Sequence, residues 1–247
     1  MNAAPDVRKE HERYETMYRG SPEPWNYRRR GAELLRHERI AEELGRLAPR
    51  YGRALDIGCS LGQLTIHLAP LAEHLFAFDV SESAVRRTRQ QLGSGGLHCA
   101  VAALPGLPFR SGGFDLIVAA DAIHEFVPEP QRARAVREIF QALRPGGVAL
   151  FTDYMQHQRF PGFLELVAGN GFAVERVVPL YDRCWYQFES WFKAVRHWTW
   201  VGGLLASIGV ARALRWPARA LGRAGSRHIL ILARKPEEKS LKGGRKP

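Results

Sequence analysis

Two short segments of the sequence have the residue types of a nucleoside-binding site. The first is residues 56–62, which read DIGCSLG, and Asp79 follows Gly62 by 17 residues. Glycines let a backbone turn tightly and approach a ligand. The helix N-terminus expected after this loop offers N–H donors to a carboxylate. A carboxylate at position 79 can accept hydrogen bonds from both hydroxyls of a ribose.

The spacing of this loop distinguishes between two kinds of ligand. A dinucleotide site requires G-x-G-x-x-G to hold a pyrophosphate, whereas this chain has Gly58-x-Ser60-x-Gly62. Asp56 would repel a pyrophosphate, but it would suit a cofactor that carries an ammonium group. A dinucleotide-dependent oxidoreductase is therefore the weaker interpretation. A strand–turn–helix without any ligand is the remaining alternative.

Polar residues that follow two later strands could handle an acceptor and its proton. Asp121, His124 and Glu125 come after the fourth predicted strand. They are the candidate catalytic bases, and His124 is attractive because the pKa of an unperturbed imidazole is near neutral. Asp153 and Tyr154 end the next strand and are candidates for substrate contact. His124 and Glu125 could instead only cap or order this loop, and Asp153 and Tyr154 could be purely structural.

The elements that must position these residues are alternating strands and helices. The pattern predicts strands at 53–59, 74–80, 97–102, 114–120, 148–152, 173–178 and 228–233. It predicts helices at 32–47, 63–71 and 82–92, a helix ended by the turn at 144–147, and a short helix around 163–168. Continuous apolar strands indicate a mostly parallel sheet covered on both faces. Ligands of such sheets bind at the carboxyl ends of the strands.

Four motifs in this region resemble those of the class I S-adenosylmethionine-dependent methyltransferases. Residues 55–62 are similar to the first motif of that family, and residues 78–81 to its second-strand acid. Residues 107–117 resemble its loop into strand four, and residues 143–147 its turn before strand five. The motifs stand in the family's order. Residues 21–28 also resemble, over a short stretch, small N-methyltransferases of the nodulation type.

The resemblance implies an α/β fold, namely a doubly wound, mostly parallel, seven-stranded Rossmann-like sheet with S-adenosylmethionine as cofactor. It places Asp56 at the amino group of the cofactor and Asp79 at the ribose. Ser60 departs from the usual middle glycine, and Ala103 stands where many members have an aspartate for the adenine. No metal ligand is expected. The expected cofactor contacts are Asp56, Gly58, Cys59, Ser60, Gly62, Asp79, Val80, Ala103, Leu104, Tyr27 and Arg28.

The rest of the chain is expected to surround this core. Residues 1–50 are predicted as an N-terminal helical flap, 51–180 as the cofactor-binding core and 181–227 as an aromatic and basic helical insertion. Residues 228–234 are predicted as the last core strand and 235–247 as a disordered tail. The insertion is interpreted as a lid over an acceptor; an additional core, a membrane-surface contact and a stacking surface for nucleobases are the alternatives.

The charge is unevenly distributed along the chain. Residues 176–247 hold 15 Lys and Arg against 4 Asp and Glu, whereas residues 1–175 hold 21 of each sign. A basic segment is typical of proteins with acidic partners, or of a solvated face. Nucleic acid is disfavoured because no recognition module is present. Contact of residues 183–227 with a membrane surface stays open.

The composition narrows the class of protein. Three cysteines without CxxC spacing indicate neither a disulfide framework nor a zinc site, and they favour a reducing cytoplasm. The first 12 residues lack the apolar part of a signal peptide. Residues 198–210 are too short to span a bilayer and are expected to form a buried or surface-lying helix.

The expected function is methyl transfer to an oxygen or nitrogen of a small-molecule acceptor, for example a sugar or a natural-product intermediate. An RNA methyltransferase and a non-catalytic S-adenosylmethionine-binding protein remain alternatives. The sequence does not indicate the oligomeric state.

Overall fold

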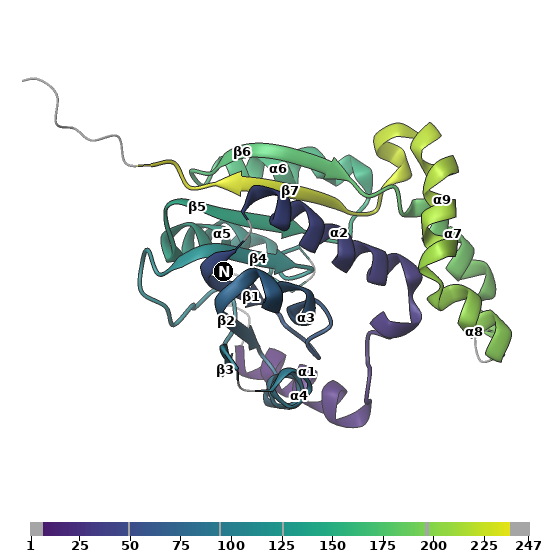
Figure 1. The fold of residues 1–247 in the computed structure, drawn as a ribbon, viewed down its shortest axis with the longest axis horizontal. Coiled ribbons are helices and arrows are strands. Elements are labelled where there is room, and N and C mark those ends of the chain that lie inside the picture. Colours follow the sequence, from purple (N-terminus) through teal and green to yellow (C-terminus); the bar gives the residue numbers. More distant parts are fainter. Residues whose placement is uncertain (1–6, 49, 94, 125, 196–197, 238–247) are drawn as a thin grey trace, which may run out of the picture.

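The computed structural model describes residues 7–48, 50–93, 95–124, 126–195 and 198–237 (Figure 1). Within these residues the centre is a seven-stranded sheet with the order β3-β2-β1-β4-β5-β7-β6. Strands β1 to β5 pair in parallel, and β7 is antiparallel to both β5 and β6. This arrangement confirms the doubly wound, mostly parallel sheet. The strands are β1 (Tyr51–Ile57), β2 (Ala72–Asp79), β3 (Leu97–Val101), β4 (Phe114–Ala120), β5 (Leu143–Thr152), β6 (Ala173–Pro179) and β7 (Ile229–Arg234).

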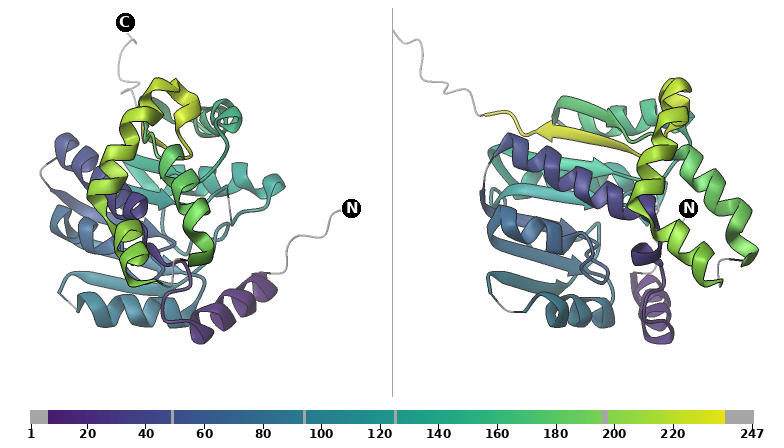
Figure 2. Two further views of the ribbon diagram at one scale, coloured as in Figure 1. Left: turned by 90° about the vertical axis from the view of Figure 1, so that its right-hand side faces the viewer. Right: turned by 45° about the vertical axis from the view of Figure 1, so that its right-hand side comes forward.

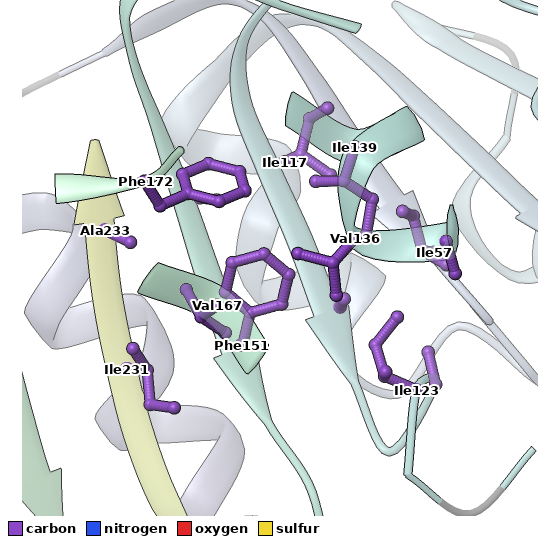
Figure 3. Close-up of a cluster of buried hydrophobic side chains, with 14 of the residues drawn as sticks. Ile57, Ile117, Ile123, Val136, Ile139, Phe151, Val167, Phe172, Ile231 and Ala233 are labelled. Carbon is purple, nitrogen blue, oxygen red and sulfur yellow. The ribbon is translucent and has the colours of Figure 1, made fainter. Parts of the chain in front are cut away.

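Helices cover both faces of the sheet because the central strands are apolar on both sides. Leu116 and Val118 of β4 belong to the core under α2 (Gly31–Leu47) and α3 (Thr65–Leu68). Ile117, between them in the sequence, points to the opposite face, which α5 (Glu129–Ala142) and α6 (Phe160–Ala168) cover. Figure 3 shows this second core, where Val136 and Ile139 of α5 lie close to Ile117. Helix α4 (Glu82–Leu92) packs beside β3 and β2.

Two groups of helices lie beyond the edge of the sheet to which the parallel strands point (Figure 2). The first is α1 (Val7–Gly20), which packs against α4. The second is the inserted group α7 (Arg183–Phe192), α8 (Thr199–Ala206) and α9 (Ile208–Ala220), between β6 and β7. Of the segment expected as a flap, α1 and residues 21–30 lie at this edge, whereas α2 packs on the sheet.

Most expected elements agree with the structure to within one to three residues, and three differ in a way that has a clear physical reason. The helix expected at 63–71 is an α-helix only over Thr65–Leu68, because Pro70 lies in a 3₁₀ turn that follows. Strand β5 begins at Leu143 rather than 148, with residues 144–147 bulging between two paired segments. The single helix expected at 198–210 is two helices, because Ser207 ends α8 and caps α9 through its hydroxyl.

Part of the expected tail, residues 238–247, lies outside the described residues. No helix among those described is both long enough and apolar enough to cross a bilayer.

Candidate functional site

The loop after β1 has a backbone that only a few residue types adopt easily. Gly58, Ser60 and Gly62 all have positive φ, at 75°, 52° and 82°. A side chain at Gly62 would place its Cβ 3.2 Å from Cγ2 of Thr88, so position 62 needs glycine for its space as well. Ser60 tolerates the left-handed conformation because neighbours hold it: the Thr88 hydroxyl donates to its carbonyl at 2.8 Å. The loop is thereby fixed against α4.

Asp79 ties this loop to the end of β2. Its buried carboxylate accepts the backbone N–H groups of Ser60 and Ser81, each at 3.0 Å. Burial raises the pKa of Asp79 to about 6, although these N–H donors act in the opposite direction. Burial likewise raises the pKa of Asp56 to about 7, and the Thr65 hydroxyl donates to it at 2.7 Å. A cationic ligand nearby would favour the ionised form of both groups.

These two loops form one wall of a cavity, here called the cofactor cavity. The wall includes two carboxylates, Asp79 and Asp121, and among the described residues it contains no Lys, Arg or His. A wall of this charge suits a cation and disfavours a pyrophosphate. The cavity is lined by Tyr14, Tyr18, Trp25, Tyr27, Ile57, Gly58, Ser60, Phe78, Asp79, Val80, Ala102, Ala103, Leu104, Ala120, Asp121, Ala122, Phe126, Val127, Pro128 and Gln131.

Helix α1 and the segment after it form the cover of this cavity. The Tyr18 hydroxyl donates to Oγ of Ser60 at 2.8 Å, and the Trp25 indole donates to the Tyr18 oxygen at 2.9 Å. Tyr14 and Trp25 both contact the Phe126 ring edge to face. The cover is therefore hydrogen-bonded directly to the glycine loop.

An acid on α1 fastens the cover to α4. The carboxylate of Glu15 accepts the hydroxyls of Ser81 and Ser83, both at 2.6 Å. Burial opposes ionisation of Glu15, but these hydrogen bonds outweigh it and lower its pKa to about 2. The sequence predicted a helical flap in this region, but it did not identify Glu15 or the two tyrosines of α1 as the residues that hold it in place. The available signal was the pair Tyr14 and Tyr18, four residues apart on one helix face.

The structure brings most of the expected cofactor contacts to this cavity. Gly58, Ser60, Asp79, Val80, Ala103, Leu104 and Tyr27 line it. Asp56, Cys59 and Gly62 are outside this lining, and the first two are buried. Arg28 is exposed and donates to Gln91 at 2.8 Å, and it does not line the cavity. Gln131 of α5 lies in the lining and was not expected from the sequence.

The three candidate bases differ in their position relative to the cofactor cavity. Asp121 lines the cofactor cavity, whereas Glu125 lies outside the described residues. His124 is outside the lining, and its backbone N–H donates to Asp153 at 3.0 Å. Burial lowers the pKa of His124, as do the guanidinium groups of Arg132 and Arg159. Tyr154, expected to contact substrate, donates its N–H to Asp121 at 2.8 Å.

Asp121 belongs to a buried group of charged side chains that the sequence did not reveal. Arg36 lies between Asp121 and Glu33, with contacts of 2.6 Å and 2.7 Å. Behind Asp121, Nε2 of His228 is 3.5 Å away, and Nδ1 of His228 bonds to Asp182 at 2.5 Å. These five residues are called the charge cluster. Their segments are far apart in the chain, so no local pattern predicts their contact.

The charge cluster fixes the protonation of its members. Burial opposes the charge of His228, but Asp182 and Asp121 outweigh it and raise its pKa to about 9. Burial also opposes the charge of Asp121, yet Arg36 and His228 hold its pKa below the usual value. Asp121 is therefore an ionised carboxylate and a weak base at neutral pH.

A second cavity adjoins the cofactor cavity at Trp25, which lines both. Arg30 binds Glu189 through two hydrogen bonds of 2.8 Å, with its guanidinium over the Tyr186 ring. Tyr186 donates to Glu33 and so connects this cavity to the charge cluster. The second cavity is lined by Trp25, Asn26, Arg30, Tyr154, Tyr186, Glu189, Ser190, Lys193 and Leu205. Among the described residues, no group of His, Cys, Asp or Glu is arranged to hold a metal ion.

Sequence comparisons find relatives over much of the chain. A family model described as a methyltransferase domain matches residues 54–147. Nodulation protein S of Bradyrhizobium diazoefficiens is 31% identical over 173 residues, which cover 68% of this chain and 77% of that protein. Carboxy-S-adenosyl-L-methionine synthase of Dichelobacter nodosus is 32% identical over 107 residues, covering 41% of this chain and 44% of that protein. The chain spans 36% to 62% of the length of three curated relatives, this synthase among them.

A solved structure has the same fold. The N-methyltransferase NodS from Bradyrhizobium japonicum, in complex with S-adenosyl-L-homocysteine, matches with a TM-score of 0.64 at 18% identity. The match covers 94% of this chain and 99% of that chain.

Proposed function

The chain belongs to the class I S-adenosylmethionine-dependent methyltransferases, and we propose that it methylates an oxygen or nitrogen of a small-molecule acceptor. S-adenosylmethionine is its methyl donor. The observation that carries the acceptor class is the second cavity, which adjoins the cofactor cavity at Trp25 and is walled by α7 and the N-terminal segment. A site between side chains from two parts of the chain suits a compact acceptor.

The residues of the cofactor cavity fit this cofactor by charge and by shape. Asp79 would hold the ribose hydroxyls, and Gly58 and Ser60 would hold the methionine part. Ala103 and Leu104 would contact the adenine. Asp56 lies one residue before the Ile57 lining and would supply negative charge for the ammonium group. When bound, the cofactor supplies an electrophilic methyl group on a sulfonium.

The cover and the charge cluster would provide the rest of the chemistry. Tyr14, Tyr18 and Trp25 close the cavity from solvent and align the reactants, which is the main requirement when the methyl donor is already activated. Asp121 presents a negative charge at the wall near a cationic donor. His124 and Glu125 stay candidates for proton removal. His228 is not a candidate, because it is protonated at neutral pH.

A calorimetric titration with S-adenosylhomocysteine tests the cofactor site. We expect Asp79→Ala to weaken binding by about 100-fold, because two hydrogen bonds to a charged acceptor are lost. Glu73→Ala is the matched control, since Glu73 is an exposed acid on the same strand. Equal affinity of the Asp79→Ala variant and the wild-type protein would contradict this assignment.

Turnover then tests the acceptor class. Transfer of a labelled methyl group to small amines and alcohols is the expected result. Methylation of RNA instead, with salt-sensitive RNA binding, would contradict a small-molecule acceptor, and so would cofactor binding without transfer to any acceptor.

A further inference from the structure

Three tryptophans at one corner of the inserted helices are unusually exposed. Trp191, Trp198 and Trp200 have exposed fractions of 71%, 49% and 62%. Tryptophan is highly buried on average in folded proteins, because its ring is a large apolar surface. We call these three residues the tryptophan corner. Together they present a large area of aromatic surface to solvent.

The tryptophan corner lies where α7 and α8 meet. Trp191 is next to the last residue of α7, and Trp198 and Trp200 lie at the beginning of α8, with ring centroids 6.1 Å apart. Helix α8 lies away from the sheet, on the far side of α7 and α9 (Figures 1 and 2). The position makes these rings accessible to a large, flat partner.

Helix α8 already uses another face for packing within the chain. Val201 and Leu205, four residues apart, are buried, and α8 packs against the short helix Tyr27–Arg29. Its end is tightly fitted, since a side chain at Gly31 would place a Cβ 2.4 Å from the Ser207 carbonyl oxygen. The tryptophans are thus held on the outside of a well-packed helix and do not form an additional core.

The segment that carries the tryptophan corner is positively charged as a whole. Residues 183–227 hold 8 Lys and Arg against a single Glu. Lys193 is exposed just after the end of α7. Arg219 and Arg223 are also exposed, but they lie near the start of α7, where Arg219 lies over the Tyr181 ring and Arg183 donates to the Ala224 carbonyl. Exposed tryptophans combined with basic residues are typical of helices that lie in the interface of anionic membranes.

We propose that the tryptophan corner anchors this protein to the surface of an anionic lipid bilayer, with the indole rings at the level of the lipid headgroups. A second copy of the chain is a poorer partner, because it would bring two strongly basic segments together. Single-stranded nucleic acid is bound in a basic groove with its bases stacked, whereas these three tryptophans are exposed near the ends of two helices.

Anchoring at this corner would also hold the second cavity near the bilayer. Glu189, Ser190 and Lys193 of that cavity come from the same end of the inserted segment as Trp191, and Leu205 comes from α8. The proposal concerns the lipid surface alone and is independent of the identity of the methyl acceptor.

Vesicle flotation tests the anchor with the full chain. We expect binding to vesicles of phosphatidylcholine with phosphatidylglycerol, little binding to phosphatidylcholine alone, and weaker binding at high salt. Replacing Trp191, Trp198 and Trp200 together by serine should lower the fraction bound by about tenfold or more. Trp216→Ser is the matched control, since Trp216 is 79% exposed but lies on α9, outside the corner.

The titration with S-adenosylhomocysteine shows that each variant is folded, because the tryptophan corner does not line the cofactor cavity. The proposal is overturned if the wild-type protein does not bind anionic vesicles, or if the triple variant binds as well as the wild type. An equal loss in Trp216→Ser would also overturn it. So would loss of RNA binding or of self-association in the triple variant without any change in lipid binding.

Discussion

The cofactor cavity and the charge cluster are built in opposite ways. The glycine loop and Asp79 belong to two consecutive strand–loop segments, and backbone N–H groups make their main contacts. The charge cluster joins side chains from α2, from the ends of β4 and β6, and from the residue before β7. One site depends on local backbone geometry, whereas the other depends on the assembly of the whole fold.

The pKa of an aspartate is therefore shifted in opposite directions in the two regions. Burial raises the pKa of Asp56 and of Asp79, since neither has a basic side chain as partner. Arg36 and His228 lower the pKa of Asp121 in spite of its burial. The carboxylates of the first region are suited to a cation that arrives from solvent. Those of the second region already have their cations within the chain.

Removal of Arg36 should have the largest effect, because it should destabilise the charge cluster without touching the glycine loop or Asp79. Arg36→Met would remove the cation that lies between Asp121 and Glu33, leaving only His228 and Arg30 near these carboxylates, and we expect the free energy of unfolding to fall by about 3 kcal/mol. Urea denaturation measures it. The matched control is Arg86→Met, whose pair with Glu82 is exposed on α4, with an expected loss of about 0.5 kcal/mol or less. Similar losses in the two variants would contradict the role of the charge cluster.

Alkaline pH should destabilise the charge cluster through loss of the His228 proton, with a smaller change in unfolding free energy than the Arg36 substitution. The pKa of His228 is raised from 6.5 to about 9, so its stabilisation is fully present below pH 6.5 and is lost as the pH rises through about 9. We expect the wild-type protein to lose on the order of 2 kcal/mol more than His228→Gln between neutral pH and pH 10. Denaturation curves at several pH values measure it. Parallel pH profiles of the two proteins would show that His228 is not held in its charged form.

The smallest expected effect is a change in cofactor affinity when the cover of the cofactor cavity is altered. Tyr18→Phe removes the hydrogen bond to Ser60 and the acceptor for Trp25, so binding of S-adenosylhomocysteine should weaken by about fivefold, equivalent to ~1 kcal/mol. The matched control is Tyr51→Phe, because the Tyr51 hydroxyl is also buried but donates to the Leu44 carbonyl away from the cavity. An equal loss of affinity in Tyr51→Phe would indicate a general loss of stability instead.

Particular elements show how far the sequence predicts the fold. Helix α4 and strand β4 have the expected bounds, because Ser81 caps the helix and the strand is a continuous apolar run. The helix expected at 198–210 was wrong as a single element, because the hydroxyl of Ser207 caps a new helix in the middle of an apolar stretch. Apolar composition does not distinguish one buried helix from two, since both bury the same residues.

The sequence by itself determined the cofactor loop, the succession of strands and helices along the chain, and the methyl donor. It could do so because Gly58, Ser60 and Gly62 act through backbone conformation, and Asp79, whose carboxylate binds this loop, lies in the same strand–helix–strand unit. Only the tertiary structure decided that Tyr18 of α1 bonds to Ser60 and that Arg36 contacts Asp121, 85 residues away in the chain. Such a contact depends on how distant elements pack together, and no local spacing of residues encodes it.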